Sequence, residues 1–234
     1  AVETAKAVER VGAKIFRSSL FKPRTSPYTY QGFGLDGIEI LKTIKQETNL
    51  LLETEILSAD HLDDLAKEVD ILRVGSRNMD NYELLKAVGR TNKPIILKRN
   101  MSATLEEFLL AAEYILSVGN EKIILCERGI RTFETYTRNT LDILAIPALK
   151  ELTHLPIIVD PSHSTGKSSL VPAASKAALA AGADGLIIEV HPDPANSYSD
   201  GQQSLKISEF ENLMKEIFEL ANVLGKKFDI PILT

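Results

Sequence analysis

The sequence of 234 residues contains a single cysteine, Cys126, so no disulfide can form within the chain. It also lacks any apolar run near the roughly 20 residues of a membrane-spanning helix, and no signal peptide is visible. The net charge of -5 excludes a general basic field that would attract nucleic acid. These absences predict a cytoplasmic protein that binds neither membranes nor nucleic acid, so an anion site would need a local cluster of lysine and arginine.

Present instead are seven short runs rich in Ile, Leu and Val, which begin at residues 13, 49, 70, 94, 122, 155 and 184. Such runs are typical of strands buried on both faces of a parallel sheet. Helical patterns fill the gaps, and the 21 to 36 residues from one run to the next fit β-loop-α units. Two helix starts carry capping boxes, Asp80 with Glu83 and Thr104 with Glu107, and Gly119 closes the second of these helices.

This repeat predicts an α/β fold of the TIM barrel type, (β/α)8, forming a single catalytic domain over residues 1–234 with no visible regulatory domain. Only seven runs are present, and the opening helical pattern has no cap before it. We therefore expect the first strand of the barrel to be missing from this chain. A seven-stranded or open doubly wound sheet is the structural alternative.

Ionisable residues follow most of these runs, at the strand ends where the catalytic groups of a barrel gather. The cations among them are Arg17, Lys22, Arg24, Arg77, Lys98 and Arg128. They outnumber the carboxylates of Glu55 and Glu127 that could pair with them. Such an excess suits phosphate, which arginine binds through two parallel hydrogen bonds and lysine binds as a point charge. Each cation alone could be a surface charge, but together they predict phosphate binding.

A second set of polar residues follows the last two runs and consists of His163, Glu189 and Asp200. One neutral imidazole with two carboxylates is a suitable ligand set for a divalent metal ion such as Mn, Fe, Co or Zn. No short motif joins the three residues. His163 could instead cap a turn, and Asp200 could be a turn residue before glycine.

Several stretches together resemble 3-deoxy-D-arabino-heptulosonate 7-phosphate (DAHP) synthase of the short, β-type class I branch. They are "KPRTSPYTYQGFG", "LKR", "ILCERGIRTFE", "VDPSHS" and "EVHPDPANSYSDGQQSL", and the likeness covers nearly all of residues 1–205. The synthase of 3-deoxy-D-manno-octulosonate 8-phosphate is also similar. It resembles this chain less, because it carries a "KANR"-type loop where this chain has "KPRT".

The resemblance implies a transferase that condenses phosphoenolpyruvate with erythrose 4-phosphate to give DAHP and phosphate. This reaction is the first step of the shikimate pathway of aromatic amino acid biosynthesis. The resemblance further implies a divalent metal ion, small phosphorylated substrates, and a homo-oligomer, either a dimer or a tetramer.

The family pattern also assigns roles to individual residues. Phosphoenolpyruvate would contact Arg17, Glu55, Ser76, Arg77, Lys98 and Arg128. Erythrose 4-phosphate would contact Lys22, Pro23, Arg24 and Thr25, with the prolines of this loop lowering the cost of ordering it. Lys98 and His163 would be catalytic, and the metal ligands would be His163, Glu189 and Asp200.

The chain departs from the family pattern at several positions. The family's fourth metal ligand is a cysteine in a "GPCS" stretch at the end of the first strand, which this sequence lacks. Ser18 and Ser19 stand where two glycines are common, and Asn100 stands where glycine is usual. Two rival functions therefore stay open: a Schiff-base aldolase with Lys98 as nucleophile, and a non-catalytic barrel that binds phosphorylated ligands.

Overall fold

The computed structural model describes residues 1–24 and 26–226, which divide into two compact units. The first unit comprises Ala1–Val2 and Ile15–Cys126, and the second comprises Glu3–Lys14 and the described residues from Glu127 onward. The predicted single domain over residues 1–234 is not tested by this division and stays a prediction.

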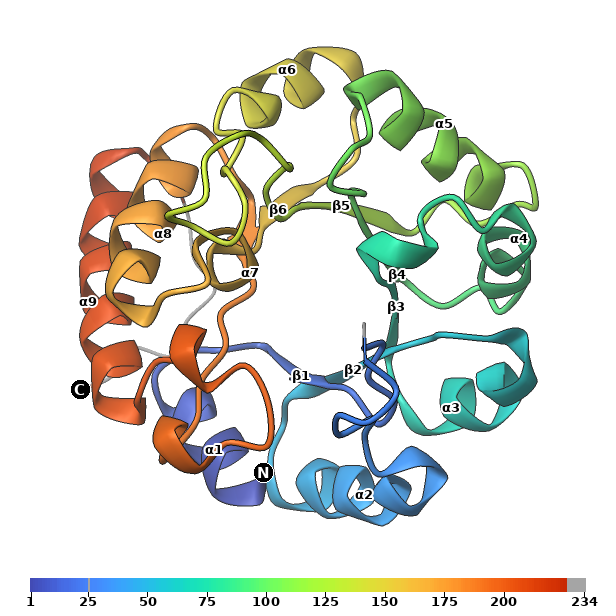
Figure 1. The fold of residues 1–234 in the computed structure, drawn as a ribbon, viewed down its shortest axis with the longest axis horizontal. Coiled ribbons are helices and arrows are strands. Elements are labelled where there is room, and N and C mark those ends of the chain that lie inside the picture. The colour runs from blue at the N-terminus through green and yellow to red at the C-terminus, as the bar shows by residue number, and fades with distance from the viewer. Residues whose placement is uncertain (25, 227–234) are drawn as a thin grey trace. The chain divides into compact units, whose positions relative to one another are not determined.

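The first unit alternates strands with helices (Figure 1). Its strands are β1 (Ile15–Ser18), β2 (Leu51–Glu55), β3 (Ile71–Val74), β4 (Ile95–Lys98) and β5 (Ile123–Glu127), the last residue of which belongs to the second unit. Its α-helices are α2 (Ile38–Glu47), α3 (Leu62–Glu68), α4 (Tyr82–Arg90) and α5 (Leu105–Leu116). Short 3-10 turns are η1 (Gly34–Gly37), η2 (Ala59–His61) and η3 (Ser76–Asn78).

Strands β1 to β5 pair in parallel and in chain order, with each helix connecting one strand to the next. The register fixes which side chains share a face, because Arg17 lies beside Glu53 and Glu55 lies beside Arg73. Alternate residues of β2 point to opposite faces. One face of this part of the sheet therefore carries charged groups, and the other is apolar.

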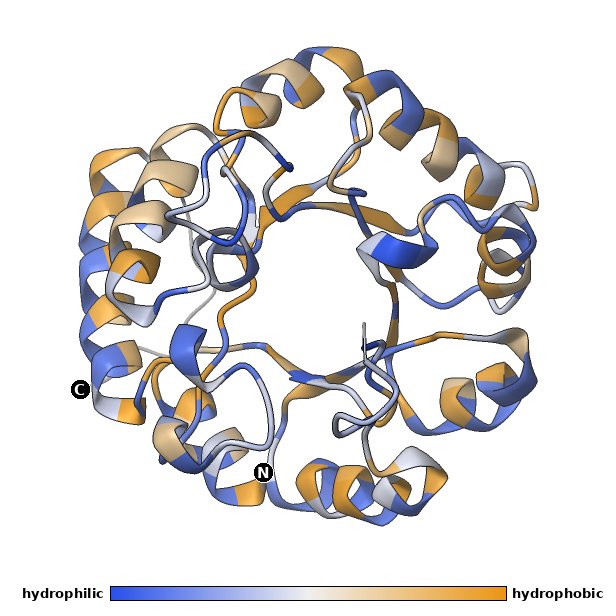
Figure 2. Cartoon of the chain, viewed as in Figure 1, coloured by the Kyte–Doolittle hydropathy of each residue, from blue (hydrophilic) through white to orange (hydrophobic). Residues whose placement is uncertain are grey.

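The apolar face is covered by helices α2 to α5, all of which lie on the same side of the strands in this unit (Figure 1). Leu52, Leu72 and Leu97 on this face have no exposed surface. Hydrophobic colour runs along the strands and alternates with hydrophilic colour around the helices (Figure 2). Burial of these aliphatic chains, at about 25 cal/mol per Å² of apolar surface, is the main favourable contribution to folding.

The second unit contains α1 (Val2–Arg10), α6 (Ala145–Leu152), β6 (Ile157–Val159), α7 (Pro161–Thr165), α8 (Val171–Ala180), β7 (Gly185–Leu186) and α9 (Ile207–Val223). Three 3-10 turns complete it: η4 (Ser168–Leu170), η5 (Pro194–Asn196) and η6 (Gly201–Gln203). β6 and β7 pair in parallel, and the N–H of Asp160 donates to the carbonyl of Glu127, which ends β5. Helices α8 and α9 lie side by side (Figure 1).

Each of the seven predicted runs contains one of these strands, so the predicted α/β fold with parallel strands is confirmed. The eight-stranded barrel and the missing first strand stay predictions. Among the described residues, no helix combines the length and apolar character needed to cross a membrane.

One of the two predicted helix caps is wrong. Helix α4 is capped by Asn81, whose side chain accepts from the N–H of Leu84, and not by Asp80. Asp80 instead accepts from the side-chain amide of Asn100 at 2.6 Å. The capping box of Thr104 and Glu107 is confirmed at α5.

Candidate active site

The charged face of the first unit is organised around Arg73 of β3, which is almost fully buried. Its Nε donates to Oε1 of Glu53 over 2.9 Å, and its Nη1 donates to Oε2 of Glu55 over 2.7 Å. Its Nη2 donates to the hydroxyl of Ser19 over 2.8 Å. Ion pairs inside a protein are tolerated when their hydrogen bonds are satisfied. This network therefore fixes Glu55, a predicted phosphoenolpyruvate contact.

The two buried carboxylates respond differently to their surroundings. Burial raises the pKa of Glu53 above the ordinary glutamate value, and the charge of Arg73 only partly opposes it. Burial also acts to raise the pKa of Glu55, but the positive charges of Arg73, Arg17 and Lys98 outweigh it and the net shift is downward. Glu55 is thus held as a carboxylate among cations.

Gly75 makes room for the Glu55 carboxylate at the end of β3. A Cβ at position 75 would overlap Oε1 of Glu55, so a larger residue there would push the carboxylate aside. Ser76, the next residue, is buried and starts η3. The same turn presents Arg77.

The loop after β1 folds back on itself. The N–H of Lys22 donates to the carbonyl of Gln31 over 2.7 Å, and Nε of Arg24 donates to the carbonyl of Tyr30 over 3.1 Å. Nη1 of Arg77 reaches the carbonyl of Pro23 at 3.5 Å. The structure therefore brings the predicted sugar phosphate loop beside a predicted phosphoenolpyruvate residue.

The other predicted residues that the structure describes in this unit lie within strands or at their ends. Arg17 lies on β1, and Lys98 ends β4 with 3% of its surface exposed. Thr25 lies outside the described residues. Ser18, which replaces a glycine of the family pattern, donates from its hydroxyl to the carbonyl of Glu53.

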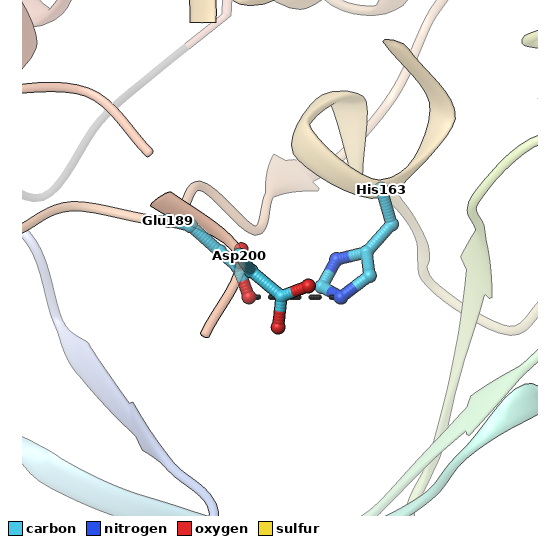
Figure 3. Close-up of side chains that lie close together, drawn as sticks. All are labelled: His163, Glu189 and Asp200. Atoms are coloured by element: carbon cyan, nitrogen blue, oxygen red, sulfur yellow. Dashed lines mark ion pairs between the residues drawn. The ribbon is translucent and has the colours of Figure 1, made fainter. Parts of the chain in front are cut away.

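The second unit holds the three predicted metal ligands together, as Figure 3 shows for His163, Glu189 and Asp200. One ligand atom of each lies within 4.8 Å of those of the other two. Nε2 of His163 is 3.6 Å from Oε1 of Glu189. The three side chains converge from α7, from the segment after β7 and from the residue that precedes η6 (Figure 3).

Further residues contact the side chains of His163 and Glu189 and fix their orientation. Oδ2 of Asp160 lies 2.8 Å from Nδ1 of His163, and Oδ1 of Asp160 caps α7 by accepting from the N–H of His163. Nε2 of Gln203 donates to Oε2 of Glu189 over 2.6 Å. Such outer partners are usual for metal ligands, because they fix ring tautomer and carboxylate orientation.

The donor set fits a divalent transition metal. His163 turns Nδ1 toward Asp160, which leaves Nε2 on the side of Glu189. The imidazole nitrogen and two carboxylate oxygens are the donors that such ions prefer. The set does not discriminate between Mn, Fe, Co and Zn.

Arg128, predicted to bind phosphoenolpyruvate, follows β5 in the second unit and is 5% exposed. The preceding Glu127 is fully buried, and its Oε1 accepts from the N–H of Gly129 over 2.6 Å. This bond ties the carboxylate to the turn that carries Arg128.

Sequence reasoning assigned no role to several residues of these clusters, namely Glu53, Arg73, Asp160 and Gln203, nor to Arg138, whose Nη1 donates to Oε1 of Gln203. Glu53 and Arg73 could have been found, because each is a charged residue within a run of aliphatic residues. Successive side chains of a strand point to opposite faces, so a charged residue next to a buried leucine lies on the other face of the sheet. Gln203 lies in the "EVHPDPANSYSDGQQSL" stretch that carries the family resemblance, whereas nothing in the local sequence marks Arg138.

A match to a known family shows which family the chain belongs to. The sequence profile described as "DAHP synthetase I family" matches residues 1–224. This chain belongs to the DAHP synthetase I family. The resemblance inferred from the motifs is therefore confirmed.

The individual relatives agree with the family. The chain is 50% identical over 226 residues to the phospho-2-dehydro-3-deoxyheptonate aldolase of Thermotoga maritima, an alignment that covers 97% of this chain and 67% of that protein. The crystal structure of this DAHP synthase superposes with a TM-score of 0.94, covering 97% of this chain and 66% of that one at 50% identity. The chain thus spans about two thirds of the length of that relative.

A more distant relative is the 2-dehydro-3-deoxyphosphooctonate aldolase of Syntrophotalea carbinolica. It is 32% identical over 219 residues, covering 88% of this chain and 78% of that protein. The chain is therefore more similar in sequence to the DAHP synthase than to this octulosonate enzyme.

Proposed function

We propose that this family member condenses phosphoenolpyruvate with erythrose 4-phosphate to form DAHP and phosphate, as the first step of the shikimate pathway. The observation that carries the proposal is the clustering of His163, Glu189 and Asp200 in a chain 50% identical to a DAHP synthase. The proposed assembly is a (β/α)8 barrel in a homo-oligomer, located in the cytoplasm.

In the proposed reaction, C3 of phosphoenolpyruvate forms a bond to the aldehyde carbon of erythrose 4-phosphate. Water adds at C2, and the phosphate leaves from C2 as inorganic phosphate. The aldehyde oxygen gains a proton and becomes a hydroxyl group. Atoms balance, since one water is consumed for each phosphate released.

The residues of the first unit bind and orient the substrates. Arg17, Arg77 and Lys98 hold the phosphate and carboxylate of phosphoenolpyruvate, with Glu55 and Ser76 beside them, and Arg128 is a further contact that the family resemblance implies. The loop with Lys22, Pro23, Arg24 and Thr25 holds the phosphate of the sugar. Fixing both substrates in this way lowers the entropic cost of the bimolecular step.

Proton transfer is assigned to two residues. Lys98 is nearly buried, and we assign to it the proton that the aldehyde oxygen gains. His163, whose Nδ1 lies 2.8 Å from Oδ2 of Asp160, is assigned the second catalytic role, at the addition of water. A divalent metal ion held by His163, Glu189 and Asp200 would supply Lewis acid chemistry at the aldehyde.

The decisive experiment measures phosphate release from phosphoenolpyruvate with two alternative sugar phosphates. The four-carbon erythrose 4-phosphate should support turnover. The five-carbon sugar phosphate that an octulosonate product requires should support less than about 1% of that rate, because the loop was predicted to suit the shorter sugar. Faster turnover with the five-carbon sugar would replace the proposal by the octulosonate reaction, and no turnover with either would favour the non-catalytic alternative.

A further inference from the structure

Glu189 uses its two carboxylate oxygens for different partners. Oε1 faces the ligand cluster, 3.6 Å from Nε2 of His163. Oε2 accepts a hydrogen bond of 2.6 Å from Nε2 of Gln203. The bond to Gln203 therefore orients the carboxylate so that Oε1 is the oxygen that faces the ligand cluster.

The direction of this hydrogen bond is set by Arg138. Nη1 of Arg138 donates to Oε1 of Gln203 over 2.9 Å, and a guanidinium group cannot accept. The carboxamide oxygen of Gln203 must therefore face Arg138, which turns the amide nitrogen toward Glu189. Gln203 is 3% exposed, so the surroundings leave little room for water to take over its role.

Arg138 also reaches the third ligand. The same Nη1 lies 3.4 Å from Oδ1 of Asp200, at the edge of η6. Asp200 has a positive φ of 58°, which is uncommon for a residue other than glycine. Its carbonyl is held by the N–H of Gln203 and the hydroxyl of Ser204. Asp200 and Gln203 thus belong to one small turn that Arg138 contacts twice.

The backbone of Arg138 is anchored to the element that carries the first ligand. Its N–H donates to the carbonyl of Thr165, at the end of α7, and the side-chain amide of Asn139 donates to the carbonyl of His163. Gly166 allows the close approach, since a Cβ there would lie 2.6 Å from Cβ of Arg138. Arg138 therefore connects the elements of all three ligands.

We propose that Arg138 and Gln203 are positioning residues that hold Glu189 as a one-oxygen metal ligand and set the affinity of the site. The inference rests on the proposed metal site and deepens it. Neither residue touches the reacting atoms in this scheme, because Arg138 acts through Gln203 and Asp200.

Because Arg138 is positively charged, the proposal and a purely electrostatic role predict opposite effects of its removal on metal affinity. As a simple positive charge, Arg138 would weaken cation binding, so its removal would raise the metal affinity. As a positioning residue, its removal lowers the affinity, since Glu189 and Asp200 lose their fixed orientation. Loss of an outer partner typically costs 10- to 100-fold in metal affinity.

The experiment compares R138M, Q203M and the double variant by competition between the protein and a chelator for Co²⁺. R131M and Q202M are matched controls, because both are exposed residues of the same types on the same segments. We expect Co²⁺ binding to be about tenfold weaker in each single variant. In the double variant it should be weaker by no more than about 30-fold, because Arg138 acts partly through Gln203 and the two losses therefore overlap. The controls should bind as the wild type does, and thermal unfolding should show that every variant is folded.

A second readout is the visible absorption of bound Co²⁺. It should weaken in Q203M, because a freed Glu189 can bind through both oxygens and raise the coordination number. R138K should recover part of the lost affinity, since lysine can still donate to Gln203.

Two results would overturn the positioning role while leaving the metal site intact: unchanged or tighter Co²⁺ binding in R138M, or losses that multiply to about 100-fold in the double variant. A wild-type protein that binds no Co²⁺ would overturn both the positioning role and the proposed metal site.

Discussion

Arg73 on β3 donates from Nη1 to Oε2 of Glu55 on β2 over 2.7 Å, although both side chains are almost fully buried. The same guanidinium binds Glu53, two residues earlier on β2. A single cation therefore fixes two carboxylates on the charged face of this part of the sheet. The arrangement orients Glu55 and also makes the fold dependent on Arg73.

Replacing Arg73 with methionine should strongly destabilise the protein. The change keeps an unbranched side chain but leaves Glu53 and Glu55 buried without this partner. Removing one member of a buried ion pair typically costs about 3–5 kcal/mol. Urea unfolding of R73M against wild type measures the loss. K176M breaks the exposed pair of Lys176 and Glu216 and should change stability by less than about 1 kcal/mol. Equal effects of the two changes would contradict the argument.

The two carboxylates should respond to pH in opposite directions. The folded pKa of Glu55 lies below its ordinary value of about 4.3. Its contribution to stability is therefore present above that pH and lost as the pH falls through the folded pKa. The folded pKa of Glu53 is raised, so its ionised form costs stability at neutral pH and this cost disappears as the pH falls through its folded pKa.

Urea unfolding of E55Q and E53Q at pH 7 and pH 4 separates these contributions. The cost of E55Q should be larger at pH 7 than at pH 4, and the cost of E53Q should be smaller at pH 7 than at pH 4. If both costs changed with pH in the same direction, the assignment of the two shifts would be wrong.

Strand positions could be predicted from the sequence because burial on both faces requires continuous aliphatic residues, as in β4 (Ile95–Lys98). The clustering of His163, Glu189 and Asp200 could be predicted because these residues follow strands at the end where side chains converge. The role of Arg73 could not, since its partners Glu53 and Glu55 lie about 20 residues away in the sequence and only the strand register brings them together.

The contact of Arg138 with Gln203 was even harder to predict from the sequence. These residues are 65 positions apart and both belong to loops or turns. The cap of α4 was misplaced by one residue because Asp80 and Asn81 are both good cap residues, and the structure uses Asp80 to hold Asn100.

Replacing Arg24 with alanine should raise the KM for erythrose 4-phosphate by about tenfold or more. A lost hydrogen bond to a charged group is worth about 1.5–3 kcal/mol. The KM for phosphoenolpyruvate should change less than about threefold, because its contacts are assigned elsewhere. Steady-state kinetics of phosphate release measures both values. R24K tests whether a positive charge alone is enough, since lysine keeps the charge but lacks the planar guanidinium whose Nε donates to Tyr30. A similar increase in both KM values would count against the sugar phosphate role of this loop.

Lys98 should not form a covalent adduct with substrate. A Schiff-base aldolase would join the amine of a lysine at a strand end to a substrate carbonyl, and borohydride would trap the product. Lys98 instead lies near two buried carboxylates, because its charge acts to lower the pKa of both Glu53 and Glu55. Mass spectrometry after borohydride treatment with erythrose 4-phosphate should find unmodified Lys98, and a chelator should abolish turnover until a divalent metal is restored. An adduct on Lys98 together with chelator-resistant turnover would establish the Schiff-base mechanism instead.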